Sequence, residues 1–148
     1  MTAEELWREF ITIKSVEECE YDAWAFGVDA DQLARLVVTG EKTATASAYP
    51  LYAVDGEPLP KAGEYSVILD SADNAVCIIS TEKVTVIPFN EVSADHAYKE
   101  GEGDKSLDYW REVHRKIFTE WMNEARLEFT TDMPVVCEEF AVVYKANI

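Results

Sequence analysis

The chain has 148 residues, of which 48% are hydrophobic, and this is the size and composition of one ordinary globular domain. Its 29 acidic residues outnumber its 13 basic ones, so the formal net charge is -16. Because so acidic a chain repels phosphates, duplex DNA is excluded as a general partner, and a small molecule or a short single strand fits better. The acidic N-terminus and the lack of a long apolar run predict a cytoplasmic protein with no membrane contact.

We expect residues 1–148 to form a single domain with an N-terminal helical extension over about residues 1–27. Residues 2–5 have the Thr-x-x-Glu spacing of a capping box, and apolar residues follow at helical spacing to about residue 14. Residues 21–27 hold three aromatic side chains, and we interpret them as a loop pinned to the core. If this loop borders a cleft, Trp24 is suited to stack on a base.

A second helix is predicted to begin at Asp29 or Asp31 and to end at Gly40, a residue type that tolerates the left-handed conformation of a helix C-terminus. Small and β-branched residues follow at once, which predicts a junction between helix and strand. Lys42 and Thr45 are an odd number of residues apart. If both side chains are to face one cleft, either Lys42 lies in the turn, outside the regular strand, or a bulge re-aims it.

This junction places a cation beside three hydroxyl groups. Lys42 lies in the turn, and Thr43, Thr45 and Ser47 follow within five residues, with few bulky side chains to block a ligand. Such hydroxyls are candidate nucleophiles. They are equally at home on a surface strand, where threonine fits the pleated sheet, and the local pattern alone is more typical of that strand.

The middle of the chain is predicted to form a loop followed by strands. Residues 49–63 contain three prolines and two glycines, which indicates a long ordered loop and a candidate lid over a cleft. Residues 64–70 and 75–80 alternate in the manner of a hairpin, and residues 81–87 continue with a similar pattern. We therefore expect two or three successive antiparallel strands.

The last third is predicted to hold two helices and a closing strand. Asn90 or Ser93 caps a short helix, and Ser106 caps the longest one, which runs to about Ala125. Residues 134–144 form the final strand. Hairpins mixed with helices indicate an α+β fold, built on a small, mostly antiparallel and curled sheet or barrel with flanking α-helices.

Between these two helices, Glu100, Glu102 and Asp104 alternate with glycines. Glycine lets the backbone turn tightly, so the three carboxylates can converge on a divalent cation or take part in acid–base chemistry. The spacing does not match an EF-hand loop. The alternative is an acidic turn that favours the positive N-terminal end of the next helix, and taken alone the pattern favours this alternative.

The long helix carries two further candidates. His114 lies on or near its apolar stripe, where a structural histidine is commoner than a catalytic one. Arg111, Arg115 and Lys116 form the densest basic patch, which suits a phosphate or neutralises the acidic loop. No phosphate loop, dinucleotide fingerprint or His-Glu-x-x-His motif occurs, and the three separated cysteines predict neither disulfides nor a zinc site.

Several of these motifs together resemble the ASCH domain family, in particular its branch of small bacterial proteins of the YhfF type. They are Gly40-Glu41-Lys42-Thr43-Ala44-Thr45, Gly63-Glu64-Tyr65, Ala97-Tyr98-Lys99-Glu100-Gly101-Glu102-Gly103-Asp104 and Trp110-Arg111-Glu112-Val113-His114. With Trp24-Ala25-Phe26-Gly27 they cover nearly the whole chain. The resemblance implies a PUA-like β-barrel with flanking helices, a fold associated with RNA and nucleoside recognition.

The resemblance also implies a set of site residues. Some relatives hydrolyse N4-acetylcytidine to cytidine and acetate with a lysine, a threonine and a glutamate, and another is similar to a ribonuclease that acts on single strands. The Lys-x-x-Thr pair matches Lys42 and Thr45, and the glutamate matches Glu100, so these three are the expected catalytic residues. The expected ligand-binding residues are Thr43, Ser47, Trp24, Glu102, Asp104, Arg111 and His114.

The sequence thus favours a metal-independent amidohydrolase that acts on N4-acylated cytidine or a similar small amide. The alternatives are a single-strand-specific ribonuclease and a non-catalytic RNA- or nucleotide-binding module. In the first hypothesis a neutral, desolvated Lys42 takes the proton of the Thr45 hydroxyl, and Glu100 protonates the departing amine. We expect no cofactor, a small nucleoside or a short single-stranded RNA as partner, and make no prediction about the oligomeric state.

Overall fold

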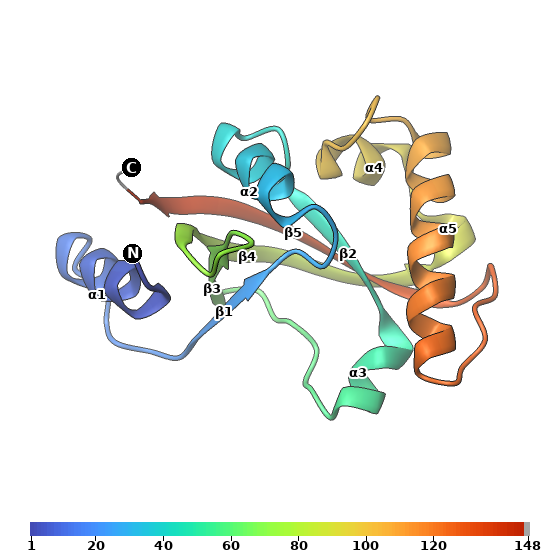
Figure 1. Cartoon of the computed structure of the whole chain (residues 1–148), viewed down its shortest axis with the longest axis horizontal. Helices are drawn as coiled ribbons and strands as arrows, with labels where there is room; N and C mark the ends of the chain where they lie inside the picture. The colour runs from blue at the N-terminus through green and yellow to red at the C-terminus, as the bar shows by residue number, and fades with distance from the viewer. Residues whose placement is uncertain (147–148) are drawn as a thin grey trace.

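The structure, a computed structural model, describes residues 1–146 and contains one five-stranded sheet with helices around it (Figure 1). The elements in chain order are α1 (Ala3–Ile13), β1 (Tyr21–Ala25), α2 (Ala30–Thr39), β2 (Ala44–Ala48), α3 (Tyr49–Asp55), β3 (Tyr65–Leu69), β4 (Ala75–Pro88), a 3-10 turn (Phe89–Glu91), α4 (Ala94–Glu100), α5 (Leu107–Glu124) and β5 (Pro134–Lys145). Figure 1 shows α1 and α5 at opposite ends of the molecule. The predicted α+β fold class is confirmed.

The sheet has the strand order β1-β3-β4-β5-β2. β1 runs parallel to β3, and all other neighbours are antiparallel. Register shifts interrupt the long β4–β5 ladder beside Ile78 and Thr81, and such bulges bend a strand and increase its twist. The sheet is therefore mostly antiparallel, as predicted, and curls into a half-barrel whose edges are β1 and β2.

Three segments differ from the sequence prediction. Residues 21–25, predicted as a loop, form β1, because they pair with residues 65–69 far along the chain, and local sequence carries no sign of that pairing. The predicted loop over residues 49–63 begins with the helix α3, in which Pro50 occupies the first turn, where its missing N–H costs nothing. Residues 75–88 form one continuous strand rather than two.

The predicted helix ends are largely confirmed. The hydroxyls of Thr2, Ser93 and Ser106 each accept a bond from the backbone N–H three residues on, at 3.1 Å in all three cases. Gly40 ends α2 with a φ of 85°, in the left-handed region that glycine tolerates. Asp31 does not cap α2, because its carboxylate instead accepts bonds from the backbone and hydroxyl of Ser71.

Helices cover both faces of the sheet. α1 packs through Leu6, Trp7 and Phe10 against Val67 and Ile78, so the helix expected in the N-terminal extension is part of the core. α2 packs on the other face, against the neighbouring residues 68 and 79, because successive side chains of a strand point to opposite faces. None of the helices described in residues 1–146 is long and apolar enough to cross a membrane.

Candidate functional site

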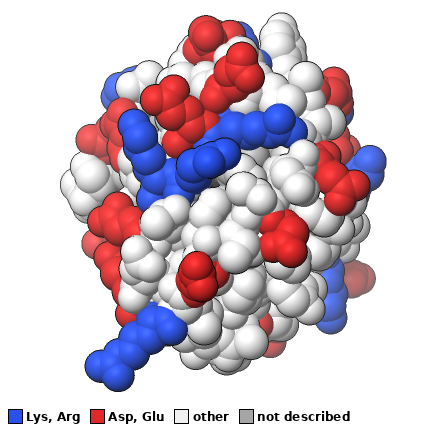
Figure 2. Space-filling view, turned by 90° about the vertical axis from the view of Figure 1, so that its right-hand side faces the viewer, with Lys and Arg blue, Asp and Glu red and all other residues white. Residues whose placement is uncertain are grey.

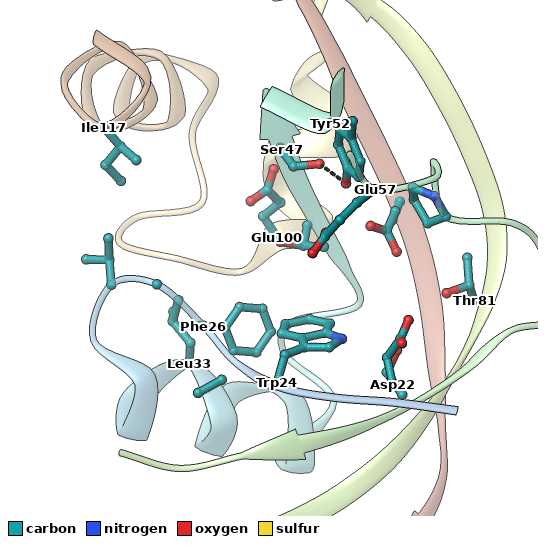
Figure 3. Close-up of a pocket in the computed structure, with 18 of the residues that line it drawn as sticks. Asp22, Trp24, Phe26, Leu33, Ser47, Tyr52, Glu57, Thr81, Glu100 and Ile117 are labelled. Carbon is teal, nitrogen blue, oxygen red and sulfur yellow. Dashed lines mark hydrogen bonds between the residues drawn. The ribbon is translucent and has the colours of Figure 1, made fainter. Parts of the chain in front are cut away.

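A cavity of about 610 Å³, within the range of small-molecule sites, lies on the face of the sheet that α2 covers (Figure 3). Every strand contributes to it: Trp24 from β1, Ser66 from β3, Thr81 from β4, Glu138 from β5 and Thr45 from β2. Ile117, Phe118 and Trp121 line it from α5, and Tyr52 with residues 57–60 line it from the segment predicted as a lid. Lys42, Thr45 and Glu100 thus share one cavity.

The junction between α2 and β2 aims Lys42 at this cavity. The backbone N–H of Lys42 donates to the carbonyl of Leu36 at 2.9 Å, and β2 begins only at Ala44. Lys42 therefore lies in the turn, outside the regular strand, which is one of the two arrangements that let it share a cleft with Thr45. Its side chain is 1% exposed.

Three oxygen atoms surround the amine of Lys42. Nζ lies 2.9 Å from Oε2 of Glu102, 3.5 Å from Oε1 of Glu100 and 3.4 Å from the backbone carbonyl of Glu100. An ammonium has three donors to match three acceptors, whereas a neutral amine would turn its lone pair toward an oxygen. The geometry therefore favours the ammonium form and argues against the neutral lysine base expected from the sequence.

Glu100 ends α4 and is 1% exposed. Its carboxylate accepts from His96 Nε2 at 2.7 Å and from the indole N–H of Trp110, and His114 Nε2 lies 3.5 Å away. Burial acts to raise the pKa of Glu100, but the Lys42 charge and the bonds from His114 and His96 outweigh it and hold the pKa well below its usual value. An ionised carboxylate is a poor general acid, so this arrangement favours Glu100 as a partner of Lys42 over the proton donation expected from the sequence.

Each of the two interpretations of the acidic loop, residues 100–104, holds for part of it. Glu100 and Glu102 converge, but on the Lys42 ammonium. Between them Gly101 has a φ of 73°, and a Cβ there would collide with the carbonyl of Glu41, so only glycine allows this turn. Asp104 turns away and accepts from the backbone N–H of Ser106 at 2.9 Å, at the N-terminus of α5.

Of the expected ligand-binding residues, some line the cavity and others do not. Trp24, Ser47, Glu102 and His114 line the cavity, and the hydroxyls of Ser47 and Tyr52 are 2.7 Å apart. Thr43, Asp104 and Arg111 do not line it. The Thr43 hydroxyl donates to the carbonyl of Lys99, and Arg111 donates to the carbonyls of Asn90 and Val92, which ties α5 to the 3-10 turn. These three residues therefore lie outside the cavity that Lys42, Thr45 and Glu100 share.

Aromatic rings form much of the wall. Trp24 and Phe26 meet edge to face, with ring centroids 5.0 Å apart, and Figure 3 shows them side by side in the cavity. Nζ of Lys42 lies 5.4 Å from the centroid of Phe26. Tyr52 and Trp121 complete this set, which suits a flat, uncharged ring. Sequence reasoning found Trp24 but missed the other three, which only tertiary packing brings together.

Sequence reasoning also missed four carboxylates of the lining, namely Asp22, Glu57, Glu64 and Glu138. Glu138 is half-buried on β5, directly opposite Thr45 on β2. Burial, together with the nearby charge of Glu64, raises the pKa of Glu138 to about 7 against a bond from Thr81. The next residue, Glu139, points the other way to Lys99, whose hydrogen bond lowers its pKa.

Replacing Glu138 by Gln is expected to change how stability depends on pH. Its folded pKa is raised from 4.5 to about 7, so the native state binds the proton more tightly, and the wild type loses stability as the pH rises across this window. The Gln variant lacks that loss. Urea unfolding from pH 4 to 8 should show that the free energy of unfolding of the variant, relative to that of the wild type, increases with pH up to about pH 7.

Glu139→Gln is the matched control for this measurement. Because the pKa of Glu139 is lowered, its contribution is present above its usual pKa and disappears as the pH falls. Its replacement should therefore lower stability by a constant amount above pH 4.5, without changing the slope there, and should change the slope only at more acidic pH. Parallel curves for wild type and Glu138→Gln throughout that window would contradict the assignment.

Residues 22–144 match the family model of the ASCH domain, and the chain belongs to this family. Its fold is similar to the crystal structure of an ASCH domain from Lactobacillus crispatus JV V101, with 34% identity and a TM-score of 0.89 over 95% of this chain and 93% of that one. A protein of Enterococcus faecalis V583 has 39% identity and the same TM-score over 96% and 88%.

A mutant ASCH protein from Zymomonas mobilis is 13% identical, with a TM-score of 0.50 over 86% of this chain and 72% of that one, and shows the fold alone. No curated protein matches the chain significantly. The ASCH domain is a PUA-like fold that is associated with RNA binding, and the PUA-like α+β architecture expected from the motifs is thereby confirmed.

Proposed function

We propose that this chain is a hydrolase that cleaves a small, uncharged amide, with N4-acylated cytidine as the representative substrate. The observation that carries the proposal is the shared cavity of Lys42, Thr45 and Glu100, enclosed by aromatic side chains. Thr45 is half-buried in this lining, so its hydroxyl is accessible to a ligand of the size that the cavity admits. A hydroxyl nucleophile and a cation that line the same cavity are groups that acyl transfer can use.

Thr45 Oγ is the nucleophile in this proposal, and its attack on the amide carbonyl produces an oxyanion. The Lys42 ammonium stabilises that charge, an effect that is strong for a cation as buried as this one. Two of its three oxygen contacts are long, at 3.4 and 3.5 Å, so it can turn to the substrate at little cost. Glu100 acts as a positioning residue, because it holds Lys42 without touching the reacting atoms.

The charge of the lining favours a nucleoside over RNA. Among the described residues that line the cavity, Lys42 is the one lysine or arginine, against six carboxylates: Asp22, Glu57, Glu64, Glu100, Glu102 and Glu138. A phosphodiester would be repelled there, whereas an uncharged ring and amide would not. Figure 2 shows basic and acidic side chains intermingled on the face that carries α5, rather than one broad basic surface.

The test is incubation of the purified protein with N4-acetylcytidine, with its 5′-monophosphate and with labelled single-stranded RNA, each with and without a chelator. Chromatography should show cytidine and acetate from the nucleoside, much slower release from the monophosphate and intact RNA. Any RNA binding should be weak and fall steeply with salt. Cleavage of RNA without nucleoside turnover would replace this proposal with the ribonuclease, and tight RNA binding with no turnover would replace it with the binding module.

A further inference from the structure

We propose that Glu138 is the proton carrier of this site, the group that takes the Thr45 proton and passes it to the departing amine. The inference rests on the proposed function and fills a role that the two other candidates leave open. Lys42 already has three acceptors around its ammonium, and Glu100 has all its partners within the protein. Neither is arranged to exchange a proton with a substrate.

The register of the sheet places Glu138 beside Thr45. The two residues are directly opposed on the antiparallel strands β5 and β2, and both line the cavity. Opposed residues of such strands project from the same face, with Cβ atoms about 5 Å apart, a separation that a glutamate side chain spans. The Thr45 hydroxyl is therefore within reach of the Glu138 carboxylate, directly or through one water.

The surroundings of Glu138 suit a group that gains and loses a proton near neutral pH. It faces the Thr81 hydroxyl from β4 and carboxylates or a phenol from the other elements: Asp22 from β1, Tyr52 from α3, and Glu57 and Glu64 from the segment before β3. In residues 1–146 no lysine, arginine or histidine forms an ion pair with Glu138. The pKa of its carboxyl, raised to about 7, agrees with this arrangement.

The proton balance follows directly. Glu138 takes the proton of Thr45 as Oγ bonds to the amide carbon, and the protonated carboxyl then gives it to the nitrogen as the C–N bond breaks and the amine leaves. Water enters, and Glu138 takes one of its protons while the oxygen attacks the acyl ester. The ester C–O bond then breaks, Thr45 recovers its proton from Glu138, and the acid leaves as acetate with release of one proton to solvent.

The test is the pH dependence of N4-acetylcytidine hydrolysis by the wild type and by Glu138→Gln. In the wild type, kcat/KM should rise with pH with a midpoint of about 7. In Glu138→Gln this rise of kcat/KM with pH should disappear. Its kcat should fall by on the order of 10² to 10⁴-fold, with little change in substrate binding. The matched control is Glu139→Gln, the next residue on β5, whose side chain pairs with Lys99 outside the cavity and whose profile should equal that of the wild type.

A second variant keeps Glu138 in place and covers the case in which Glu138→Gln does not fold. Thr81→Val removes the hydroxyl whose hydrogen bond lowers the pKa of Glu138, so the midpoint of the rise in kcat/KM should move to higher pH. If the wild type is active but its rise of kcat/KM with pH persists in Glu138→Gln, or keeps its midpoint in Thr81→Val, the role of Glu138 is overturned. The proposed function would stand in that case. A raised KM with unchanged kcat would make Glu138 a binding residue and also overturn its role as proton carrier. A wild type with no turnover overturns the proposed function and this inference together.

Discussion

Thr45→Ala is expected to lower turnover of N4-acetylcytidine by on the order of 10³-fold or more, because it removes the atom that forms the acyl ester. The fold should be retained, since the change deletes a small, half-buried group, and the loss of stability should be about 1 kcal/mol. Thr45→Ser should keep part of the activity, because the hydroxyl survives and only the methyl group that restricts its rotamer is lost. Steady-state kinetics with urea unfolding separates these effects.

Thr43→Ala is the matched control for this experiment. Thr43 lies two residues away, but its hydroxyl donates to the carbonyl of Lys99 and does not line the cavity. Its replacement should leave kcat within a few-fold of the wild type. An active Thr45→Ala protein would remove Thr45 as the nucleophile and point to direct attack by water.

The second large effect is expected from Lys42→Met, which leaves the Glu100 carboxylate buried without its cation. Breaking one side of such a pair costs about 3 to 5 kcal/mol of unfolding free energy. The pKa of Glu100 is held below its usual 4.5, so its stabilisation is present above that pH and is lost as the pH falls through the folded value. Urea unfolding should therefore show the largest deficit near neutral pH and a smaller one in acid.

Two comparisons make the result specific to the buried pair. The double variant Lys42→Met with Glu100→Gln should recover part of the loss, because neither charge is left buried alone. Lys116→Met breaks an exposed pair with Glu112, 3.6 Å long, and should leave stability nearly unchanged. Equal losses for Lys42→Met and Lys116→Met would contradict the role given to burial.

The parts of the fold that local sequence determines could be predicted. Gly40 ends α2, serine caps α4 and α5, and alternating apolar residues mark β3 and β5, because caps and periodicity act within a few residues. β1 could not be predicted as a strand. Its residues Tyr21–Ala25 are ordered by a parallel pairing with residues 65–69, and that pairing depends on contacts distant in the sequence.

For the candidate site, too, only the features that depend on neighbouring residues could be predicted from the sequence. The spacing of Lys42 and Thr45 called for a turn or a bulge before the regular strand, and the glycines around Glu102 allowed the carboxylates to converge. That these carboxylates converge on the Lys42 ammonium could not be predicted, because it depends on how α4 packs against the start of β2. The role proposed for Glu138 depends on the β2–β5 register, which sets it opposite Thr45 and turns Glu139 outward, a choice that one residue of slip would reverse.

The most direct test of the account is the mass of the Thr45-containing peptide after acid quench during turnover of N4-acetylcytidine. The proposal predicts one added acetyl group on Thr45 in the wild type, present only while substrate remains, and no such adduct in Thr45→Ala. Release of several equivalents of cytidine from a wild type whose Thr45 peptide stays unmodified at every quench time would contradict it.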